Sequence, residues 1–406
     1  MTPQARLQAA IEILDLVIDA AKNNGAAADT IIAGWFKTRR YAGSGDRRAV
    51  RELVYAAIRA FGTRPHSGRA AMLGMGKALR HLFDGSPYGP AEFSPHEAVA
   101  GPSPLSAWLA GLIDKHEHAA LLERAPLDLR VNRLMAERDT VLAQFAGAVA
   151  VGRDGIRLTD NINIEAHPAF LEGRVDIQDA GSQLIAEVCE VRAGMTVVDL
   201  CAGAGGKTLA LAADMEGNGR IVATDTNRDR IQRLPARAAR MGVLVDALPD
   251  PKADDRFSTD WKALATIETR LLNPGEEFDT LLDLKRQADV VLVDAPCSGS
   301  GTWRRNPEAR WRLTPHRLNA VIETQRHVLN IGAALVKPGG ALVYAVCSLI
   351  DREGKDQIAA FLNDHKGWTA VPIDARMGEP HDAGWRVSPA RDGCDGFFMV
   401  KVARSA

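Results

Sequence analysis

Residues 197–213, VVDLCAGAGGKTLALAA, decide the fold that this sequence predicts. The β-branched residues at 196–200 are typical of a short buried strand, and the apolar residues within 208–215 are typical of a helix. The glycines between them allow a tight turn and a close approach of the backbone to another group, because glycine has no Cβ. Strand, glycine-rich turn and helix in this order are the first unit of a doubly wound, mostly parallel α/β sheet.

The same alternation continues toward the C-terminus. Further strands are predicted at 221–224, 290–293 and 341–346, and a helix is predicted at 228–241. In open α/β sheets of this kind, ligands bind beyond the carboxyl ends of the strands. We therefore expect the functional residues immediately after the predicted strands.

The glycine-rich turn does not match either common phosphate-binding motif. A P-loop requires glycine where the chain has Cys201, and the dinucleotide motif requires glycine where it has Thr208. Asp225 ends the next strand, where a carboxylate can accept hydrogen bonds from ribose hydroxyls. The pattern predicts a nucleoside without phosphates, for which S-adenosyl-L-methionine is the candidate. The alternative is a structural turn beside a surface aspartate.

Two cysteines follow two of the predicted strands. Cys297 lies in DAPCSGSG (294–301), and Cys347 follows the strand at 341–346. One such cysteine is usually a small buried apolar residue, but two at separate strand ends favour covalent chemistry. Methylation of a pyrimidine at carbon 5 needs a thiolate that adds to carbon 6. A carboxyl at ring N3 would stabilise the developing charge; Asp294 is the candidate, with a pKa raised by burial.

An arginine- and tryptophan-rich segment follows, TWRRNPEARWR at 302–312. Arginines bind phosphates, and aromatic rings stack on unpaired bases. The segment thus predicts a contact with single-stranded RNA, and the alternative is a charged surface loop.

Charge is unevenly distributed along the chain, although 50 Lys and Arg nearly balance 51 Asp and Glu. Residues 1–84 hold thirteen basic and seven acidic residues, whereas 246–283 hold ten acidic and four basic residues. Apolar residues with helical spacing predict that 1–84 form helices. A basic helical module suggests a nucleic-acid partner, and ordinary surface variation is the alternative.

Composition also excludes several classes of protein. The five cysteines include no C-x-x-C pair, so no zinc site is expected. No apolar run of about 18 residues is present, and residues 1–20 lack the apolar core of a signal peptide. We therefore expect no membrane partner, no metal and a cytoplasmic protein with reduced thiols. The predicted domains are helices at 1–84, a Pro/Gly-rich linker with helices at 85–125, an α+β subdomain at 126–178 and the sheet domain at 179–406.

Several motifs together carry a resemblance to a known family. They are VVDLCAGAGGKTLALAA, ATD (223–225), DAPCSGSGTWRRNPEARW (294–311), LVYAVCS (342–348), APLDLRVN (125–132), DIQDAGSQL (176–184) and DGFFMVKVAR (395–404). The set resembles the RsmB-type (Sun/Fmu) RNA cytosine-C5 methyltransferases. The N-terminal GDRRAVRELVYAAIR (45–59) is similar to the NusB-like RNA-binding domain of such enzymes.

The resemblance implies a Rossmann-like S-adenosyl-L-methionine domain and a role for each matching residue. It makes Cys347 the nucleophile, although the Pro-Cys context alone favours Cys297, and it assigns Cys297 to product release and Asp294 to cytosine N3. The implied cofactor-binding residues are Cys201, Ala202, Gly203, Ala204, Gly205, Gly206, Lys207, Asp225, Arg230 and Asp294. The expected RNA-binding residues are Arg304, Arg305, Arg310, Arg47 and Arg48.

The sequence departs from the family pattern in a few places. Gly203-Ala204 replaces the usual Ala-Pro, Val346 replaces a threonine, and Gly354 replaces an asparagine. None of these changes removes a group that the chemistry requires. The expected substrate is RNA, with small-subunit ribosomal RNA favoured, and the expected state is a monomer. A tRNA-directed enzyme and a non-catalytic RNA-binding or ribosome-assembly protein remain the alternatives.

Overall fold

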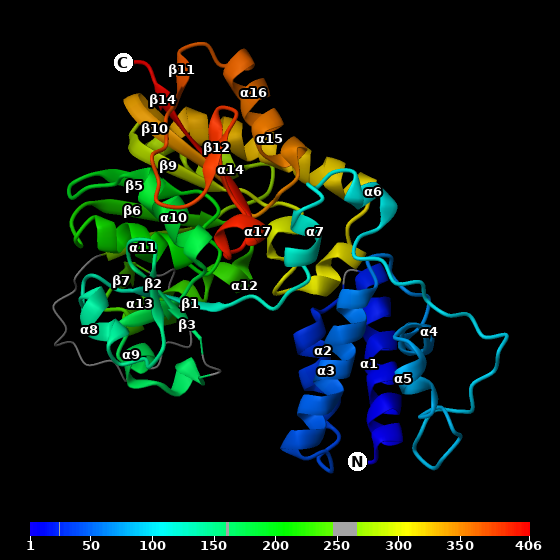
Figure 1. Cartoon of the computed structure of the whole chain (residues 1–406). Helices are drawn as coiled ribbons and strands as arrows, with labels where there is room; N and C mark the ends of the chain where they lie inside the picture. The colour runs from blue at the N-terminus through cyan, green and yellow to red at the C-terminus, as the bar shows by residue number, and fades with distance from the viewer. Residues whose placement is uncertain (24, 160–161, 247–265) are drawn as a thin grey trace. The chain divides into compact units, whose positions relative to one another are not determined.

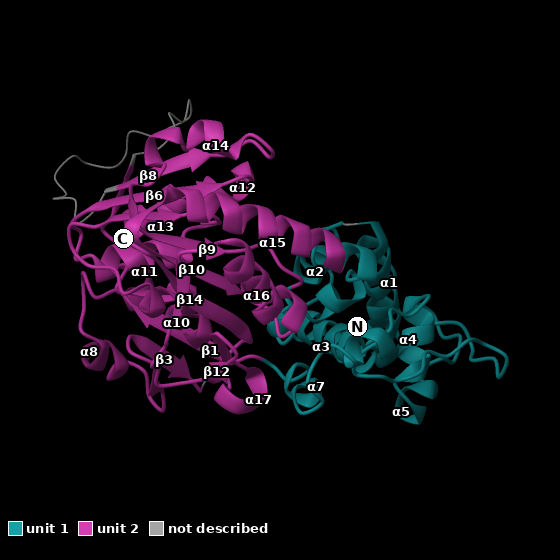
Figure 2. Cartoon of the chain, turned by 90° about the horizontal axis from the view of Figure 1, so that it is seen from above, with its two compact units in different colours: residues 1–124, 299–317 teal, residues 125–298, 318–406 magenta. Residues whose placement is uncertain are grey.

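The computed structural model describes residues 1–23, 25–159, 162–246 and 266–406. The chain forms two compact units, one of residues 1–124 with 299–317 and the other of residues 125–298 with 318–406 (Figure 2). Part of the acidic stretch predicted at 246–283 lies outside the described residues. None of the helices within the described ranges combines the length and apolar character needed to cross a lipid bilayer.

The first unit is helical. Its α-helices are α1 (Pro3–Asn23), α2 (Ala28–Lys37), α3 (Ser44–Ala60), α4 (Gly68–Gly74), α5 (Lys77–Arg80), α6 (Ala107–Ala110) and α7 (Glu117–Ala120). The apolar stripes predicted on the first and third of these are buried, including Leu7 and Leu14 on α1 and Val54 and Ile58 on α3. These side chains share one core, as expected for helices whose apolar faces follow the 3.6-residue period.

The segment predicted as a linker packs against these helices. The Ala100 N–H donates to the Ala70 carbonyl over 3.1 Å, and the Arg69 guanidinium pairs with the Glu97 carboxylate. Residues 85–124 therefore belong to the helical unit, whereas a separate linker was expected, because backbone hydrogen bonds and an ion pair hold them there.

The arginine- and tryptophan-rich segment also belongs to the helical unit. It contains the 3₁₀-helices η3 (Ser300–Thr302) and η4 (Pro307–Trp311). Trp303 and Trp311 are buried, and the Trp311 indole N–H donates to the Phe61 carbonyl over 2.6 Å. These two rings therefore serve the core and are not available to stack on bases.

The side chain of Arg310 caps the C-terminal end of helix α3. Its guanidinium donates to the carbonyls of Ile58, Arg59 and Phe61 over 2.5, 2.8 and 3.3 Å. The last carbonyls of a helix have no partner within it, and a cation there is favourable for the helix dipole. Burial, reinforced by Arg59, lowers the pKa of Arg310 to about 10, so the side chain remains charged at neutral pH.

The predicted RNA contact is therefore wrong for two of the five arginines. Arg310 is 1% exposed and Arg304 is 6% exposed, and the Arg304 guanidinium contacts the carbonyl of Arg124. Arginines next to tryptophans have the same sequence pattern in an RNA-binding loop and in a buried helix cap. By contrast, Arg47 and Arg48 are exposed on α3, and Arg305 is partly exposed.

The second unit begins with a small antiparallel sheet of order β2-β3-β1-β4. Its strands are β1 (Leu127–Val131), β2 (Val149–Val151), β3 (Gly155–Leu158) and β4 (Val175–Ile177), with helices α8 (Arg138–Leu142) and α9 (Pro168–Leu171) beside them and 3₁₀-helix η1 (Ile164–Ala166). These elements lie within the range predicted as an α+β subdomain, 126–178, and belong to the same compact unit as the large sheet. Among the described residues, Leu129, Val131 and Ile156 are fully buried in its core.

The large sheet has the order β12-β13-β14-β10-β9-β5-β6-β8-β7, with β11 paired to β14. Its strands are β5 (Thr196–Asp199), β6 (Arg220–Asp225), β7 (Leu244–Asp246), β8 (Thr266–Leu271), β9 (Ala288–Asp294), β10 (Val336–Val346), β11 (Trp368–Val371), β12 (Glu379–His381), β13 (Gly384–Val387) and β14 (Phe397–Arg404). The pairs from β10 through β7 are parallel, and those from β12 through β10 are antiparallel. The predicted doubly wound, mostly parallel sheet is confirmed.

Helices cover both faces of this sheet. They are α10 (Ala180–Cys189), α11 (Gly206–Asp214), α12 (Arg228–Ile231), α13 (Leu234–Arg240), α14 (Glu277–Thr280), α15 (Pro315–Leu335), α16 (Lys355–Asp364) and α17 (Pro389–Asp392), with 3₁₀-helices η2 (Leu282–Leu284) and η5 (Asp351–Glu353). Helices α10 and α11 lie on one side of the sheet, and α15 and α16 lie on the other (Figure 1). Val197 shares a core with α10 and α11, whereas its neighbour Val198 shares a core with α15 and α16. Successive strand residues point to opposite faces, so a continuous apolar run fills both cores.

Candidate active site at the strand ends

Four strands place the predicted site residues at one edge of the sheet. In the order β10-β9-β5-β6 these strands are neighbours and parallel, so their carboxyl ends lie side by side. Cys347, Asp294 and Asp225 follow or end three of them, and the glycine-rich turn follows the fourth. The expectation that these residues lie on a common edge is confirmed by the topology.

The glycine-rich turn is anchored to Asp225. One carboxylate oxygen accepts the Gly203 N–H over 2.8 Å, and the other accepts the Asn227 N–H over 2.7 Å. Gly203 has φ +57°, close to the Arg230 guanidinium, which lies 3.8 Å from the Asp225 carboxylate. Both oxygens of Asp225 retain lone pairs that can accept further hydrogen bonds.

Gly205 shows why this turn requires glycine. Its φ of +80° lies in the left-handed region, and a Cβ there would be 1.7 Å from Cδ1 of Leu234. A side chain would therefore both strain the backbone and clash with α13. Glycine at this position therefore lets the turn pack closely against α13.

Lys207 and Asp294 form an ion pair at this edge. The ammonium Nζ lies 2.7 Å from Asp294 Oδ2, and the two side chains are 12% and 28% exposed. Burial lowers the pKa of Lys207, but its attraction to and hydrogen bond with Asp294 outweigh that effect and raise the pKa overall. Lys207 is therefore a cation, and it holds Asp294 at the end of β9.

The two cysteines meet at the neighbouring strand end. The Sγ atoms of Cys297 and Cys347 are 3.1 Å apart, and both cysteines are half-buried thiols that form no disulfide. Cys201 packs against the same apolar cluster as Cys297. Two thiols, a carboxylate and an ammonium group thus converge beside a glycine-rich turn.

Comparisons with known proteins give the family of the chain. A profile of the family described as 16S rRNA methyltransferase RsmB/F matches residues 186–403. The chain belongs to the RsmB/F family.

Individual relatives agree with this assignment. The ribosomal RNA small subunit methyltransferase B of Sodalis glossinidius is 33% identical over 74% of this chain and 64% of its own length. The protein of the same name from Shewanella oneidensis is 30% identical over 70% of this chain and 61% of its own length. The matched region thus spans a little over three fifths of these relatives.

Solved structures share the fold of this RsmB/F chain. The crystal structure of PH0851 matches 99% of both chains with a TM-score of 0.72 and 23% identity. A methyltransferase homologue from Pyrococcus horikoshii matches 71% of this chain and 90% of its own with a TM-score of 0.58 and 24% identity. The first match spans both units.

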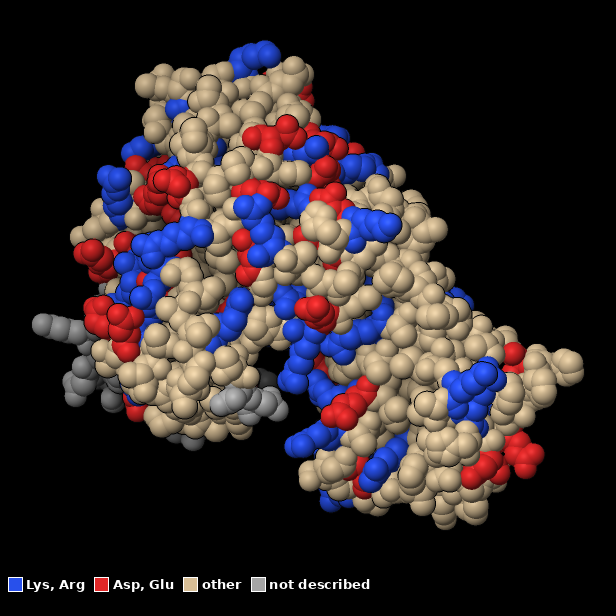
Figure 3. Space-filling model, in the orientation of Figure 1, with Lys and Arg blue, Asp and Glu red and all other residues tan. Residues whose placement is uncertain are grey.

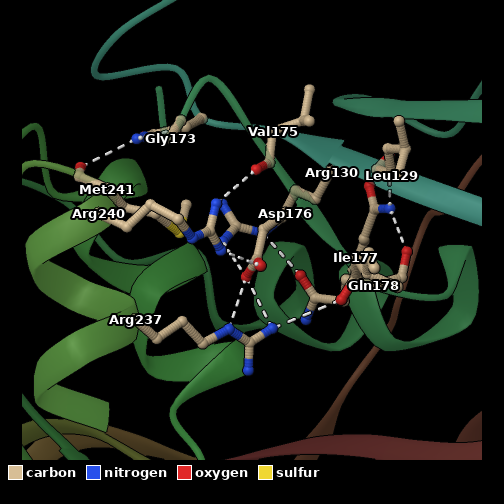
Figure 4. Close-up of polar contacts among 12 residues, drawn as sticks. Leu129, Arg130, Gly173, Val175, Asp176, Ile177, Gln178, Arg237, Arg240 and Met241 are labelled. Atoms are coloured by element: carbon tan, nitrogen blue, oxygen red, sulfur yellow. Dashed lines mark hydrogen bonds and ion pairs between the residues drawn. The ribbon is translucent and has the colours of Figure 1, made fainter. Parts of the chain in front are cut away.

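An ion-pair cluster that was not predicted from the sequence supports the glycine-rich turn of the RsmB/F chain. Asp176 is 2% exposed and accepts hydrogen bonds from Arg237 and Arg240 of α13 over 2.8 and 2.7 Å (Figure 4). Arg237 also contacts the Ala204 carbonyl at 3.3 Å. The visible signals were Asp176 within the DIQDAGSQL motif and two arginines three residues apart on one helix.

No metal centre is visible in the described parts of the chain, where no three His, Cys, Asp or Glu side chains gather as ligands.

Asp199 predicts a pH dependence of stability. It is 1% exposed, and burial raises its pKa to about 7 from an ordinary 3.8, although the hydrogen bond from Thr208 opposes the shift. Between these values the folded chain retains a proton that the unfolded chain has lost, so stability falls as pH rises toward 7. Asp199→Asn should remove this dependence. Relative to the unmodified chain, its free energy of unfolding should increase by about 3 kcal/mol between pH 5 and pH 8.

Urea unfolding of both proteins at the two pH values measures this difference directly. A difference between them that does not change with pH would show that Asp199 is not protonated in the folded protein.

Proposed function

We propose that this chain transfers a methyl group from S-adenosyl-L-methionine to carbon 5 of a cytosine in RNA, with small-subunit ribosomal RNA as the substrate. The observation that carries the proposal is the 3.1 Å approach of Cys297 and Cys347 beside the pair of Lys207 and Asp294. A non-catalytic RNA-binding protein needs no such convergence. The names of the relatives, ribosomal RNA small subunit methyltransferase B, agree with it.

The glycine-rich turn fits the cofactor. Its glycines have no Cβ, so the backbone can lie close to another group, and the Asp225 carboxylate has lone pairs available for ribose hydroxyls. The proposed contacts are Cys201, Ala202, Gly203, Ala204, Gly205, Gly206, Lys207, Asp225, Arg230 and Asp294. When bound there, the cofactor supplies an electrophilic methyl group on a sulfonium.

Three residues of the chain have separate roles in the reaction of the cytosine ring. The Cys347 thiolate forms a bond to carbon 6, which breaks the aromaticity and makes carbon 5 nucleophilic. Asp294 in its acid form donates a proton to ring N3 as negative charge develops there, the Lys207 ammonium pairs with the resulting carboxylate, and the proton returns to Asp294 when Cys347 leaves. Cys297 accepts the proton from carbon 5 after methylation; the electrons of that C–H bond restore the C5–C6 double bond, and the Cys347 thiolate leaves.

RNA outside the reacting base meets the basic surface of the helical unit. Lys and Arg side chains gather over α2 and α3 (Figure 3). Arg47 and Arg48 are exposed there, and Arg305 is partly exposed. Phosphate contacts of this kind give affinity that falls with salt and does not depend on sequence. A NusB-like role for this unit and a cytoplasmic location, where ribosomes are assembled, belong to the same proposal.

Methylation of RNA tests the proposed function. The purified chain with S-adenosyl-L-methionine should convert one cytosine of protein-free small-subunit rRNA to 5-methylcytosine, read by bisulfite sequencing. Mixed tRNA is the competing substrate in the same reaction. Methylation of tRNA alone would replace the rRNA assignment with a tRNA-directed enzyme. RNA binding without methylation of either substrate would overturn the catalytic proposal.

A further inference from the structure

A buried glutamate lies behind the two cysteines. Glu353 ends the 3₁₀-helix η5, six residues after Cys347, and its exposed fraction is 0%. A carboxylate removed from water is costly unless hydrogen bonds replace its hydration. The hydrogen-bond partners of Glu353 therefore indicate its role.

Four hydrogen bonds converge on this carboxylate. Oε1 accepts the Ser298 N–H over 2.7 Å and the Gln325 side-chain N–H over 3.0 Å. Oε2 accepts the hydroxyls of Ser298 and Ser348, each over 2.5 Å. Ser298 is the residue after Cys297, and Ser348 is the residue after Cys347. A single side chain thus holds the residue that follows each cysteine.

The same network restrains the surrounding loops. Gln325 of α15 also donates to the carbonyl of Pro296, the residue before Cys297, over 3.0 Å. The Tyr344 hydroxyl of β10 donates to the backbone carbonyl of Glu353 over 2.6 Å. The Cys297 loop is therefore held on both sides of the thiol, and the glutamate is tied to the strand that leads to Cys347.

We infer that Glu353 is a positioning residue that sets the distance between the two catalytic thiols. The inference rests on the proposed function, in which Cys347 attacks carbon 6 while Cys297 takes a proton from the adjacent carbon 5. Two groups that act on neighbouring ring atoms need a fixed separation, and a displacement of about 1 Å can reduce a rate by about 100-fold. The two cysteine loops come from different strands, and the Glu353 carboxylate bridges them.

Glu353→Gln tests the role with little change in size. The amide places an NH2 group where one carboxylate oxygen accepted two hydroxyls, so the bridge between the loops weakens. We expect kcat for RNA methylation to fall by about 10- to 100-fold, whereas the KM for S-adenosyl-L-methionine should change less than about 2-fold, because Glu353 has no contact with the glycine-rich turn. Asp351→Asn in the same 3₁₀-helix is the matched control, because Asp351 pairs with His381 and Lys355.

A second measurement reads the thiol distance without methylation. Diamide oxidises two neighbouring thiols to a disulfide and takes up the two hydrogens, and peptide mass spectrometry identifies the Cys297–Cys347 link. The unmodified chain and Asp351→Asn should form this link quickly, and Glu353→Gln should form it at least about 10-fold more slowly. A purely structural role would lower thermal stability and cofactor affinity without selectively slowing this reaction.

The two assays separate the two ideas. An active unmodified enzyme together with wild-type kcat and wild-type crosslinking in Glu353→Gln would overturn the positioning role alone. An unmodified chain that methylates no RNA would overturn the proposed function, and slower crosslinking in the variant would still support the bridge.

Discussion

Cys347→Ala should reduce methyl transfer to RNA by at least about 10⁴-fold. Without a thiolate at carbon 6, the cytosine ring keeps its aromaticity, and carbon 5 does not become nucleophilic. Cofactor binding should persist, because the glycine-rich turn and Asp225 are held by their own hydrogen bonds. Transfer of labelled methyl groups to RNA measures the loss, and calorimetric titration with S-adenosyl-L-methionine measures the retained binding.

Cys189→Ala is the matched control for this loss. Cys189 is fully buried in α10, away from the strand ends, and burial raises the pKa of its thiol far above the ordinary value. Its removal should cost some stability and leave methyl transfer intact. Retained activity in Cys347→Ala would instead transfer the nucleophilic role to Cys297, which the Pro-Cys context alone favours.

Cys297→Ala should trap a covalent complex between the protein and RNA. Cys347 can still add to carbon 6 and carbon 5 can still be methylated, but the group that removes the carbon 5 proton is missing. The carbon–sulfur bond therefore cannot break at its normal rate. Denaturing electrophoresis should show a protein–RNA band in this variant and little or none with the unmodified enzyme.

The double variant with Cys297→Ala and Cys347→Ala should show no band, which would locate the covalent bond at Cys347. A single Cys297→Ala variant that turns over normally and accumulates no adduct would contradict the release role.

Local sequence identified much of the active-site edge. The alternation of β-branched strands, glycine turns and helices is a local property, and it predicted the strands that carry Asp225, Asp294 and Cys347. Because ligands bind at the carboxyl ends of strands, these residues could be predicted to lie together from the sequence alone. It could not supply the 3.1 Å between the thiols or the pairing of Lys207 with Asp294.

For the arginine- and tryptophan-rich segment, the contacts predicted from local sequence differ from those in the structure. Its composition suits RNA contact, yet Arg310 caps α3 and Trp311 donates to the Phe61 carbonyl, from positions about 250 residues away in the chain. Whether an arginine contacts a phosphate or a helix end depends on which distant backbone segment packs against it. Local composition does not predict that segment.

By itself, then, the sequence determined the class of fold, the edge of the sheet that carries the site and the resemblance to a methyltransferase family, because these depend on periodicity and on motifs within short stretches. Only the tertiary structure decided that Glu353 bridges both cysteine loops, that Asp176 braces the glycine-rich turn and that Arg310 is buried. The bonds from Ser298 to Glu353, from Arg237 to Asp176 and from Arg310 to α3 join residues far apart in the chain. Buried polar groups form hydrogen bonds with the partners that the fold places beside them.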